Sequence, residues 1–328
     1  MTEDAKRATG MFPRYRLGFP VKVMGAALPS HDSRRWQNQP HLTVSLAYLR
    51  DIFTYLANCE IHFYRIAGNI APYLTHPTLP QFHNQIEESR TELAATGDLA
   101  RLYRIRLTMH PGHYIQLSSP DPARVARGHL ELEACALLLE AMGLGTEAVV
   151  VIHIGGMYED RIGSLERFVR NYHLLSPTAR SRAVLENDDR IFDIQDILWV
   201  HRRTGIRLVL DVLHHRCLNR NGVPLIDALA QTLATWPHDE QPKIHYSSPR
   251  TELRYLYQNR ERRLAMPLPN QHSDFINPFA FIDLLQNGRA AGLRPFDIML
   301  EAKAKDLALL RLRTQVAQFA PHLMDLMA

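Results

Sequence analysis

The chain has 328 residues and a formal net charge of +4, a length that allows one large domain or two ordinary ones. Its hydrophobic content of 46% is normal for a globular protein. No run of about 18 apolar residues offers a membrane span. The polar start lacks an apolar core, so we expect no signal peptide and a flexible tail over residues 1–13. Three scattered cysteines without CxxC spacing indicate a reduced, cytoplasmic protein.

Arginine dominates the basic residues of this chain. Of 38 lysines and arginines, only five are lysines, namely Lys6, Lys22, Lys243, Lys303 and Lys305. The guanidinium group is a planar fork that suits phosphates and stacks on bases, although a GC-rich genome would produce the same bias. On either interpretation, the scarcity of lysine draws attention to the positions where one occurs.

Apolar runs with strand character alternate with longer helical patterns along the chain. The expected strands are Tyr15–Pro20, Ile61–Ile66, Arg104–Met109, Ala148–Ile152, Ala183–Leu185, Arg207–Leu210, Lys243–Ile244 and Phe296–Leu300. Helices are expected at Leu130–Leu139, Leu165–Tyr172, Ile194–Arg203, Leu225–Ala234 and Phe279–Ala291. Eight alternations predict one (β/α)₈ TIM barrel over residues 14–328. A doubly wound sheet is the alternative, but no GxGxxG motif follows a strand.

Two irregular segments interrupt this alternation, at residues 25–40 and at residues 246–274. The second is rich in arginine and also carries Tyr255 and Tyr257; its arginines are Arg250, Arg254, Arg260, Arg262 and Arg263. A loop of this length inside a compact domain is usually functional or disordered.

Six consecutive expected strands, the third to the eighth, end in a histidine or an acidic residue. In chain order these are His110, His153, Glu186, Asp211, His245 and Glu301. Such ends meet at the rim where barrel enzymes have their active sites. A carboxylate beside a buried apolar run is costly unless it is paired or metal-bound. Imidazole and carboxylate together suit Zn²⁺, Mn²⁺ or Fe²⁺, and strands about 4.8 Å apart allow metals roughly 3.5–4 Å apart.

Each of these residues alone has a structural alternative, because a histidine after a strand is usually hydrogen-bonded and an acidic residue often caps the next helix. The whole set favours metal binding. Asp211 and His214 are three residues apart and could serve different metals, whereas we expect His215 to face the helices.

Two lysines lie beside expected ligands. Lys243 and His245 share one face of a strand, so both should point into the barrel. An amine at this position would have to be neutral, bind a phosphate or be carbamylated. Lys303 follows Glu301 in the same spacing; it could hold a phosphate or simply begin a helix.

In their order along the chain, these segments resemble the UV-damage endonuclease family. The matching segments are Leu17-Gly18-Phe19-Pro20, Tyr64-Arg65-Ile66, His76-Pro77, Met109-His110-Pro111-Gly112, His153-Ile154-Gly155-Gly156, Leu185-Glu186-Asn187-Asp188, Asp211-Val212-Leu213-His214-His215, Lys243-Ile244-His245 and Glu301-Ala302-Lys303. Endonuclease IV is a more distant relative with a similar barrel and metal rim.

The resemblance implies a DNA repair hydrolase that nicks duplex DNA immediately 5′ to UV photoproducts, leaving a 3′-hydroxyl and a 5′-phosphate. It implies two to three divalent metals, usually manganese, with water as the nucleophile. One metal would bind His110, His153 and Glu186, and a second would share Glu186 with Asp211, His245 and Glu301. His214 and His272 would hold a third, with Lys243 carboxylated beside it. His76 would lie near the scissile phosphate. The DNA-contacting residues would be Phe19, Arg65, His113, Tyr114, Lys303, Arg250, Arg254 and Tyr257.

The chain departs from the family pattern at two positions. His113 replaces the glutamine that, with the following tyrosine, probes damaged bases, and Phe19 replaces a strand-1 tyrosine. The arginine-rich loop suggests a clamp that places arginines on phosphates and Tyr255 or Tyr257 on bases; a solvated loop is the alternative.

Two other function classes fit parts of the pattern. A metal-dependent sugar isomerase or epimerase also uses Glu, Asp and His on a barrel, but it gains nothing from an arginine-rich loop. A damage-binding protein without catalysis is disfavoured because every ligand position is filled. We therefore expect a monomeric, nucleoid-associated enzyme acting on UV-damaged double-stranded DNA.

Overall fold

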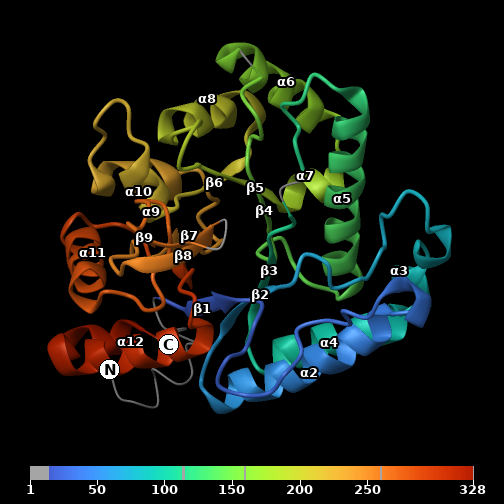
Figure 1. Ribbon diagram of the computed structural model, residues 1–328, viewed down its shortest axis with the longest axis horizontal. Helices are drawn as coiled ribbons and strands as arrows, with labels where there is room; N and C mark the ends of the chain where they lie inside the picture. The colour runs from blue at the N-terminus through green and yellow to red at the C-terminus, as the bar shows by residue number, and fades with distance from the viewer. Residues whose placement is uncertain (1–14, 113–114, 159, 259–260, 328) are drawn as a thin grey trace.

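The computed structural model describes residues 15–112, 115–158, 160–258 and 261–327. Eight parallel strands form one sheet in the order β6-β5-β4-β3-β2-β1-β10-β7, with helices around it (Figure 1). The strands are β1 Leu17–Pro20, β2 Phe63–Ile66, β3 Arg106–Met109, β4 Val150–Ile152, β5 Ala183–Glu186, β6 Arg207–Val209, β7 Lys243–Tyr246 and β10 Asp297–Leu300. Each falls on an expected strand, and the single-domain (β/α)₈ barrel is confirmed.

The barrel closes at a short seam between β6 and β7. Among the described residues, these strands meet at an isolated bridge between Asp211 and His245. The His245 N–H donates to the Leu210 carbonyl oxygen at 3.0 Å. Two expected metal ligands therefore lie at the point where the sheet closes.

Helices cover the outside of the barrel. They are α2 Leu42–Asn58, α3 Gln85–Glu88, α4 Arg90–Leu102, α5 Pro122–Ala141, α6 Arg161–His173, α7 Pro177–Arg182, α8 Ile194–Thr204, α9 Val212–Cys217, α10 Leu225–Leu233, α11 Pro278–Ala290 and α12 Lys305–Phe319, with 3₁₀ turns at Trp36–Asn38, Pro80–Phe82 and Pro321–Leu326. The five expected helices correspond to α5, α6, α8, α10 and α11. No described helix is long and apolar enough to cross a bilayer.

The segment after β7 contains a hairpin, so the expectation of an irregular loop is wrong there. Strands β8 (Arg254–Gln258) and β9 (Glu261–Ala265) pair antiparallel. The segments that lead into β8 and out of β9 also pair antiparallel, through an isolated bridge between Pro249 and His272. The Arg250 N–H donates to Gln271 O at 2.7 Å, and the Ser273 N–H donates to Ser248 O at 2.8 Å. The hairpin thus rises from the rim beside His272.

Alternation along the strands divides the core into two regions. Val149, Val151, Val184, Val209 and Trp236 form one buried cluster, which shares a strand face with His153, Glu186 and Asp211. It therefore lies inside the barrel, and the larger cluster packs between barrel and helices. Gly18 also faces inward, because a Cβ there would lie 2.7 Å from the Phe63 ring. The missing side chain gives Phe63 room inside the barrel.

Buried and half-buried arginines hold the opposite end of the barrel together. Asp297 accepts from Arg16 Nε at 2.9 Å, Arg106 Nη1 at 2.6 Å and Gln241 Nε2 at 2.7 Å. Arg294 donates to four carbonyl oxygens between Trp236 and Glu240. Part of the arginine bias therefore serves the fold, since one guanidinium group can satisfy several loop carbonyls.

Candidate metal centre

The strand alternation places the expected ligands in one inward-facing layer at the C-terminal ends of the strands. Each of the six ligands at a strand end lies two residues beyond a side chain that fills the barrel interior, as His153 lies beyond Val151 and His245 beyond Lys243. The β5 end is tied to the β6 end by Asn187, whose Oδ1 accepts from the Asp211 N–H at 2.8 Å and whose Nδ2 donates to Asp211 O at 3.2 Å.

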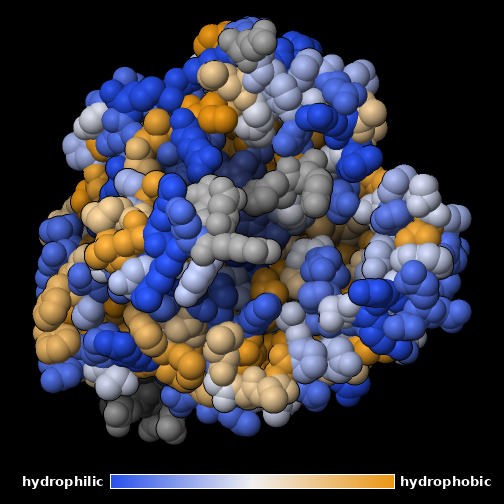
Figure 2. Space-filling view, in the orientation of Figure 1, coloured by the Kyte–Doolittle hydropathy of each residue, from blue (hydrophilic) through white to orange (hydrophobic). Residues whose placement is uncertain are grey.

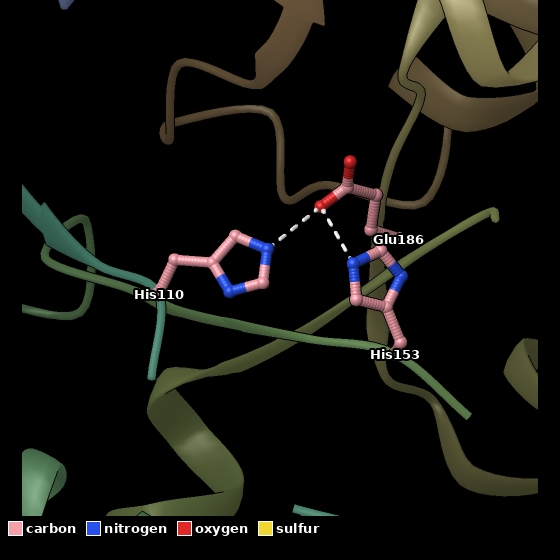
Figure 3. Close-up of side chains that lie close together, drawn as sticks. All are labelled: His110, His153 and Glu186. Atoms are coloured by element: carbon pink, nitrogen blue, oxygen red, sulfur yellow. Dashed lines mark ion pairs between the residues drawn. The ribbon is translucent and has the colours of Figure 1, made fainter. Parts of the chain in front are cut away.

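Glu186 is the centre of this layer. It is 2% exposed, and four imidazoles reach its carboxylate. His110 Nε2 and His153 Nε2 lie 3.3 and 3.6 Å from Oε2, and Figure 3 shows both rings converging on that oxygen. His245 Nδ1 and His214 Nδ1 lie 3.0 and 3.5 Å from Oε1.

The ligand atoms form three overlapping groups. Each group has its atoms within 4.8 Å of one another: His110 with His153 and Glu186, Glu186 with Asp211 and His214, and Asp211 with His245 and Glu301. The first two groups share Glu186, and the last two share Asp211. A carboxylate shared by two groups has two oxygens with which it could hold two neighbouring cations.

The residues fit divalent metals by the atoms that they leave without a partner. Among the described residues, buried atoms lacking a hydrogen bond include His153 Nδ1, Glu186 Oε2, Asp211 Oδ2 and His245 Nε2. A buried polar atom without a partner costs roughly 1–3 kcal/mol. Several such atoms converging on one rim indicate that the buried clusters could hold metal ions.

Charge in the layer leads to the same conclusion. Burial, reinforced by the charges of Glu186 and Glu301, raises the pKa of Asp211 despite the neighbouring His214. Although burial alone would lower it, Asp211 and Glu186 raise the pKa of His214 to about 9. Burial lowers the pKa values of His110 and His245. His110 and His245 thus favour the neutral imidazole, the form that binds a metal, and the carboxylates that raise the pKa of His214 are the ones a bound ion would neutralise.

Lys243 lies one step below the ligand layer. It is fully buried, and its Nζ has no hydrogen-bond partner among the described residues. The Nζ atom lies 5.6 Å from the centroid of the Phe63 ring. Burial, together with Arg65 and Arg106, lowers the pKa of this amine well below its usual value. A neutral amine is the form that can be carboxylated.

Glu301 and His272 lie on the hairpin side of the rim. Arg65 forms an ion pair with Glu301 Oε1. Burial would raise the pKa of this carboxyl, but Arg65 and then His245 bring it below its ordinary value. His272 Nδ1 lies 2.6 Å from the Glu301 carbonyl oxygen, and its ring centroid lies 6.5 Å from that of His214. His272 belongs to none of the three groups found among the described residues. It is adjacent to them.

Two of the expected DNA contacts are buried side chains. Phe19 is fully buried because the inward residues of β1 are Gly18 and Pro20, which turns Phe19 toward the helices. There it packs against Tyr64, with ring centroids 5.4 Å apart. Arg250 is 6% exposed, and it lies in the hairpin stem rather than on its surface.

Other expected contacts lie around the rim. Arg254 and Tyr257 are exposed on the hairpin. His76 is absent from the ligand groups, but it lines a cavity of about 830 Å³ that reaches His110. A second cavity, of about 540 Å³, adjoins His110, His153 and His214. His113 and Tyr114 lie outside the described residues. Figure 2 shows a hydrophilic hollow near the middle of this face.

A third cavity, of about 430 Å³, contains a residue that sequence reasoning missed. Lys305 lines it together with Arg65, His272, Glu301 and Lys303. The signal was available, because Lys305 is one of only five lysines.

Comparisons with known proteins agree with this geometry. The family model described as UV-endonuclease UvdE matches residues 29–323. A UV DNA damage endonuclease from Bacillus velezensis is 29% identical over 297 residues, covering 89% of this chain and 88% of the relative. The crystal structure of SacUVDE superposes with a TM-score of 0.79 at 30% identity, covering 93% of this chain and 98% of that chain.

A D-psicose 3-epimerase from Clostridium cellulolyticum superposes with a TM-score of 0.56 at 12% identity, covering 94% of this chain and 99% of that chain. This likeness shows only that the barrel fold is shared. The match to the UvdE family model, in contrast, spans most of the chain and includes every residue of the ligand layer. The chain belongs to the UV-endonuclease UvdE family.

Proposed function

We propose that this protein is a metal-dependent DNA repair endonuclease that nicks duplex DNA immediately 5′ to UV photoproducts, both cyclobutane dimers and 6-4 photoproducts. The products are a 3′-hydroxyl and a 5′-phosphate. The observation that carries the proposal is the set of three ligand groups joined through Glu186 and Asp211. Its support from relatives is the name UV DNA damage endonuclease that they bear.

Two to three divalent ions, Mn²⁺ in the first place, would bind in this layer. His110 and His153 would share one with Glu186, and Asp211, His245 and Glu301 would hold its neighbour. His214 and His272, with a carboxylated Lys243 nearby, would hold the third. When bound, the metals supply Lewis-acid polarisation of the phosphodiester and a water of lowered pKa.

The chain's own residues position the substrate. Arg65 and Lys303 stand beside the ligands with donors suited to phosphate oxygens. His76 faces the cavity that extends from His110, where it would contact the strand near the scissile bond. No side-chain nucleophile is needed, and the buried lower layers of the barrel exclude bulk water from beneath the ligands.

The hairpin β8–β9 would contact the duplex. One of its faces presents Tyr255 and Tyr257, which are 54% and 78% exposed. Arg262 lies opposite Tyr257, and its guanidinium carbon is 3.5 Å from the Tyr255 ring centroid. Arg254 and Arg263 occupy the other face. A two-stranded ribbon with exposed cations and aromatic rings is suited to a DNA groove and to phosphates.

Replacing Arg254, Arg262 and Arg263 together by glutamine is expected to weaken binding to duplex DNA by about 10- to 100-fold at low salt. The slope of log affinity against log salt should fall by roughly 2–3, since each lost phosphate contact contributes about 0.9. Arg289→Gln, on an exposed position in the last turn of α11, is the control and should leave the slope unchanged. An unaltered slope in the triple variant would exclude the hairpin as a DNA contact.

Incubation of UV-irradiated plasmid with protein and Mn²⁺ is expected to convert supercoiled DNA to nicked circles. EDTA should abolish nicking, and unirradiated plasmid should remain supercoiled. On an end-labelled duplex with one lesion, the nick should lie directly 5′ to it and leave an end that a polymerase extends. Ketohexoses incubated in parallel serve as the control. Epimerised sugar without EDTA-sensitive nicking would overturn the proposed function.

A further inference from the structure

The cavity that contains Lys305 has an unusual charge. Its lining comprises Pro20, Arg65, Gln271, His272, Glu301, Lys303 and Lys305. Three of these side chains are cationic, and among the described residues of the lining the one acidic side chain, Glu301, is already paired with Arg65. Lys22 is a further cation close enough to lower the pKa of Lys305, after burial and Arg65. The cavity therefore has an excess of positive charge beside the ligand layer.

The two lysines of this cavity have no counter-ion. Within the part of the chain that the structure describes, neither the Lys303 nor the Lys305 ammonium group has an ion pair. The nearby acid Asp306 is unavailable, because it is fully buried and accepts from the Met24 N–H at 2.6 Å, the Gly25 N–H at 2.9 Å and the Tyr55 hydroxyl at 2.7 Å.

The backbone holds Lys305 in place at an energetic cost. Its φ is +53°, in the left-handed region that side-chain-bearing residues adopt at a cost of roughly 1–2 kcal/mol. Lys305 is also the first residue of α12, whose N-cap residue, Ala304, makes no side-chain cap bond. The positive end of that helix adds to the field at the cavity.

We propose that Arg65, Lys303 and Lys305 form a second phosphate subsite, which binds a backbone phosphodiester of the cut strand next to the scissile one. This inference rests on the proposed function. The use of lysine supports it: in a chain with five lysines among 38 basic residues, Lys303 and Lys305 line one cavity, and the charge of Lys22 acts on Lys305. An ammonium group is a compact point charge with three donors, which suits a phosphate approached from several directions.

The subsite explains how the strand could be aligned. Its wall residue His272 lies against Glu301, so a phosphate held here would stand one or two linkages from a phosphate at the ligand layer. Neighbouring phosphates on one DNA strand are roughly 6–7 Å apart, which is about one and a half times the spacing of neighbouring barrel strands. Holding two consecutive phosphates fixes the direction of the strand and hence the side on which it is cut.

The test combines Lys303→Met/Lys305→Met with lesion duplexes that carry one neutral methylphosphonate at successive positions near the nick. In the wild-type protein, we expect one position other than the scissile linkage at which the neutral methylphosphonate lowers kcat/KM about tenfold. The double variant should lose about tenfold on the ordinary duplex. The neutral linkage should then cost it less than twofold, because charge and partner have been removed together. Lys303→Met alone provides a milder variant.

A second measurement does not depend on cutting. The salt slope for binding undamaged duplex should fall by about 0.9 or more in the double variant, with Arg289→Gln as the control. Two results would overturn the proposed subsite. One is that the loss of kcat/KM from the double variant and the loss from the neutral linkage multiply at every position. The other is that the double variant keeps the wild-type salt slope and kcat/KM. A wild-type protein that does not cut irradiated DNA would instead refute the proposed function, and the salt slope would still decide whether the lysines bind a phosphate.

Discussion

Glu186→Gln is expected to reduce nicking by at least about 10³-fold while binding to DNA largely persists. Glu186 belongs to two of the three ligand groups, and four imidazoles surround its carboxylate. An amide keeps the shape but loses the charge and one ligand oxygen. Loss of a metal's stabilisation of the transition state costs several kcal/mol, and each 1.4 kcal/mol is a factor of ten in rate.

The measurements are single-turnover nicking, DNA affinity and metal content of the purified protein. Bound metal should fall by about one to two equivalents relative to wild type. Glu166→Gln, on the exposed side of α6, is the matched control and should change none of the three. If the Glu186→Gln protein still nicked at more than a tenth of the wild-type rate, Glu186 would not be a ligand shared by two metals.

Asp297→Ala is expected to destabilise the protein by about 3–5 kcal/mol. The Asp297 side chain is fully buried, and it pairs with Arg106, whose side chain is 1% exposed, and with Arg16. Removing the carboxylate leaves the Arg106 guanidinium buried without its counter-charge, which is the costly case for a buried ion pair. The loss is measured as the shift in denaturant midpoint at constant m-value.

Asp98→Ala provides the contrast. Asp98 pairs with Arg101 on the surface of α4 at 2.5 Å, and exposed pairs of this kind contribute roughly 0–1 kcal/mol. Asp297→Asn should fall between the two variants, because it retains a hydrogen-bond acceptor and loses the charge. Equal midpoints for Asp98→Ala and Asp297→Ala would show that the Asp297 cluster contributes nothing to folding.

The ligand layer could be predicted because strand periodicity is strict. Side chains alternate along a strand with a period of two residues. Once Lys243 and His245 are placed on the inward face, this alternation places the other strand-end ligands inward as well. Applied to β1, this alternation would have placed Phe19 on the face that packs against the helices and away from the DNA side, since Gly18 and Pro20 face the interior. The expected DNA contact of Phe19 came from the family resemblance, which gives a residue's position and not the environment of a different side chain.

Features set by tertiary contacts could not be predicted in this way. The hairpin residues Arg254–Gln258 and Glu261–Ala265 form an exposed ribbon, so they lack the buried apolar run that marks the barrel strands. Their pairing depends on the stem that links Pro249 to His272. Burial of Arg250 follows from the same stem. Lys305 escaped notice because only the fold brings it beside Arg65, which is far away in sequence.

The seam of the barrel connects the proposed metals with the survival of the fold. Among the described residues, β6 and β7 are joined at Asp211 and His245, two side chains of one ligand group. An ion bound by both would fasten the last gap in the barrel wall. A free metal concentration 100 times the dissociation constant would then add about 2.7 kcal/mol to the free energy of unfolding. Starvation for the metal would thus lower the amount of intact protein in addition to silencing it.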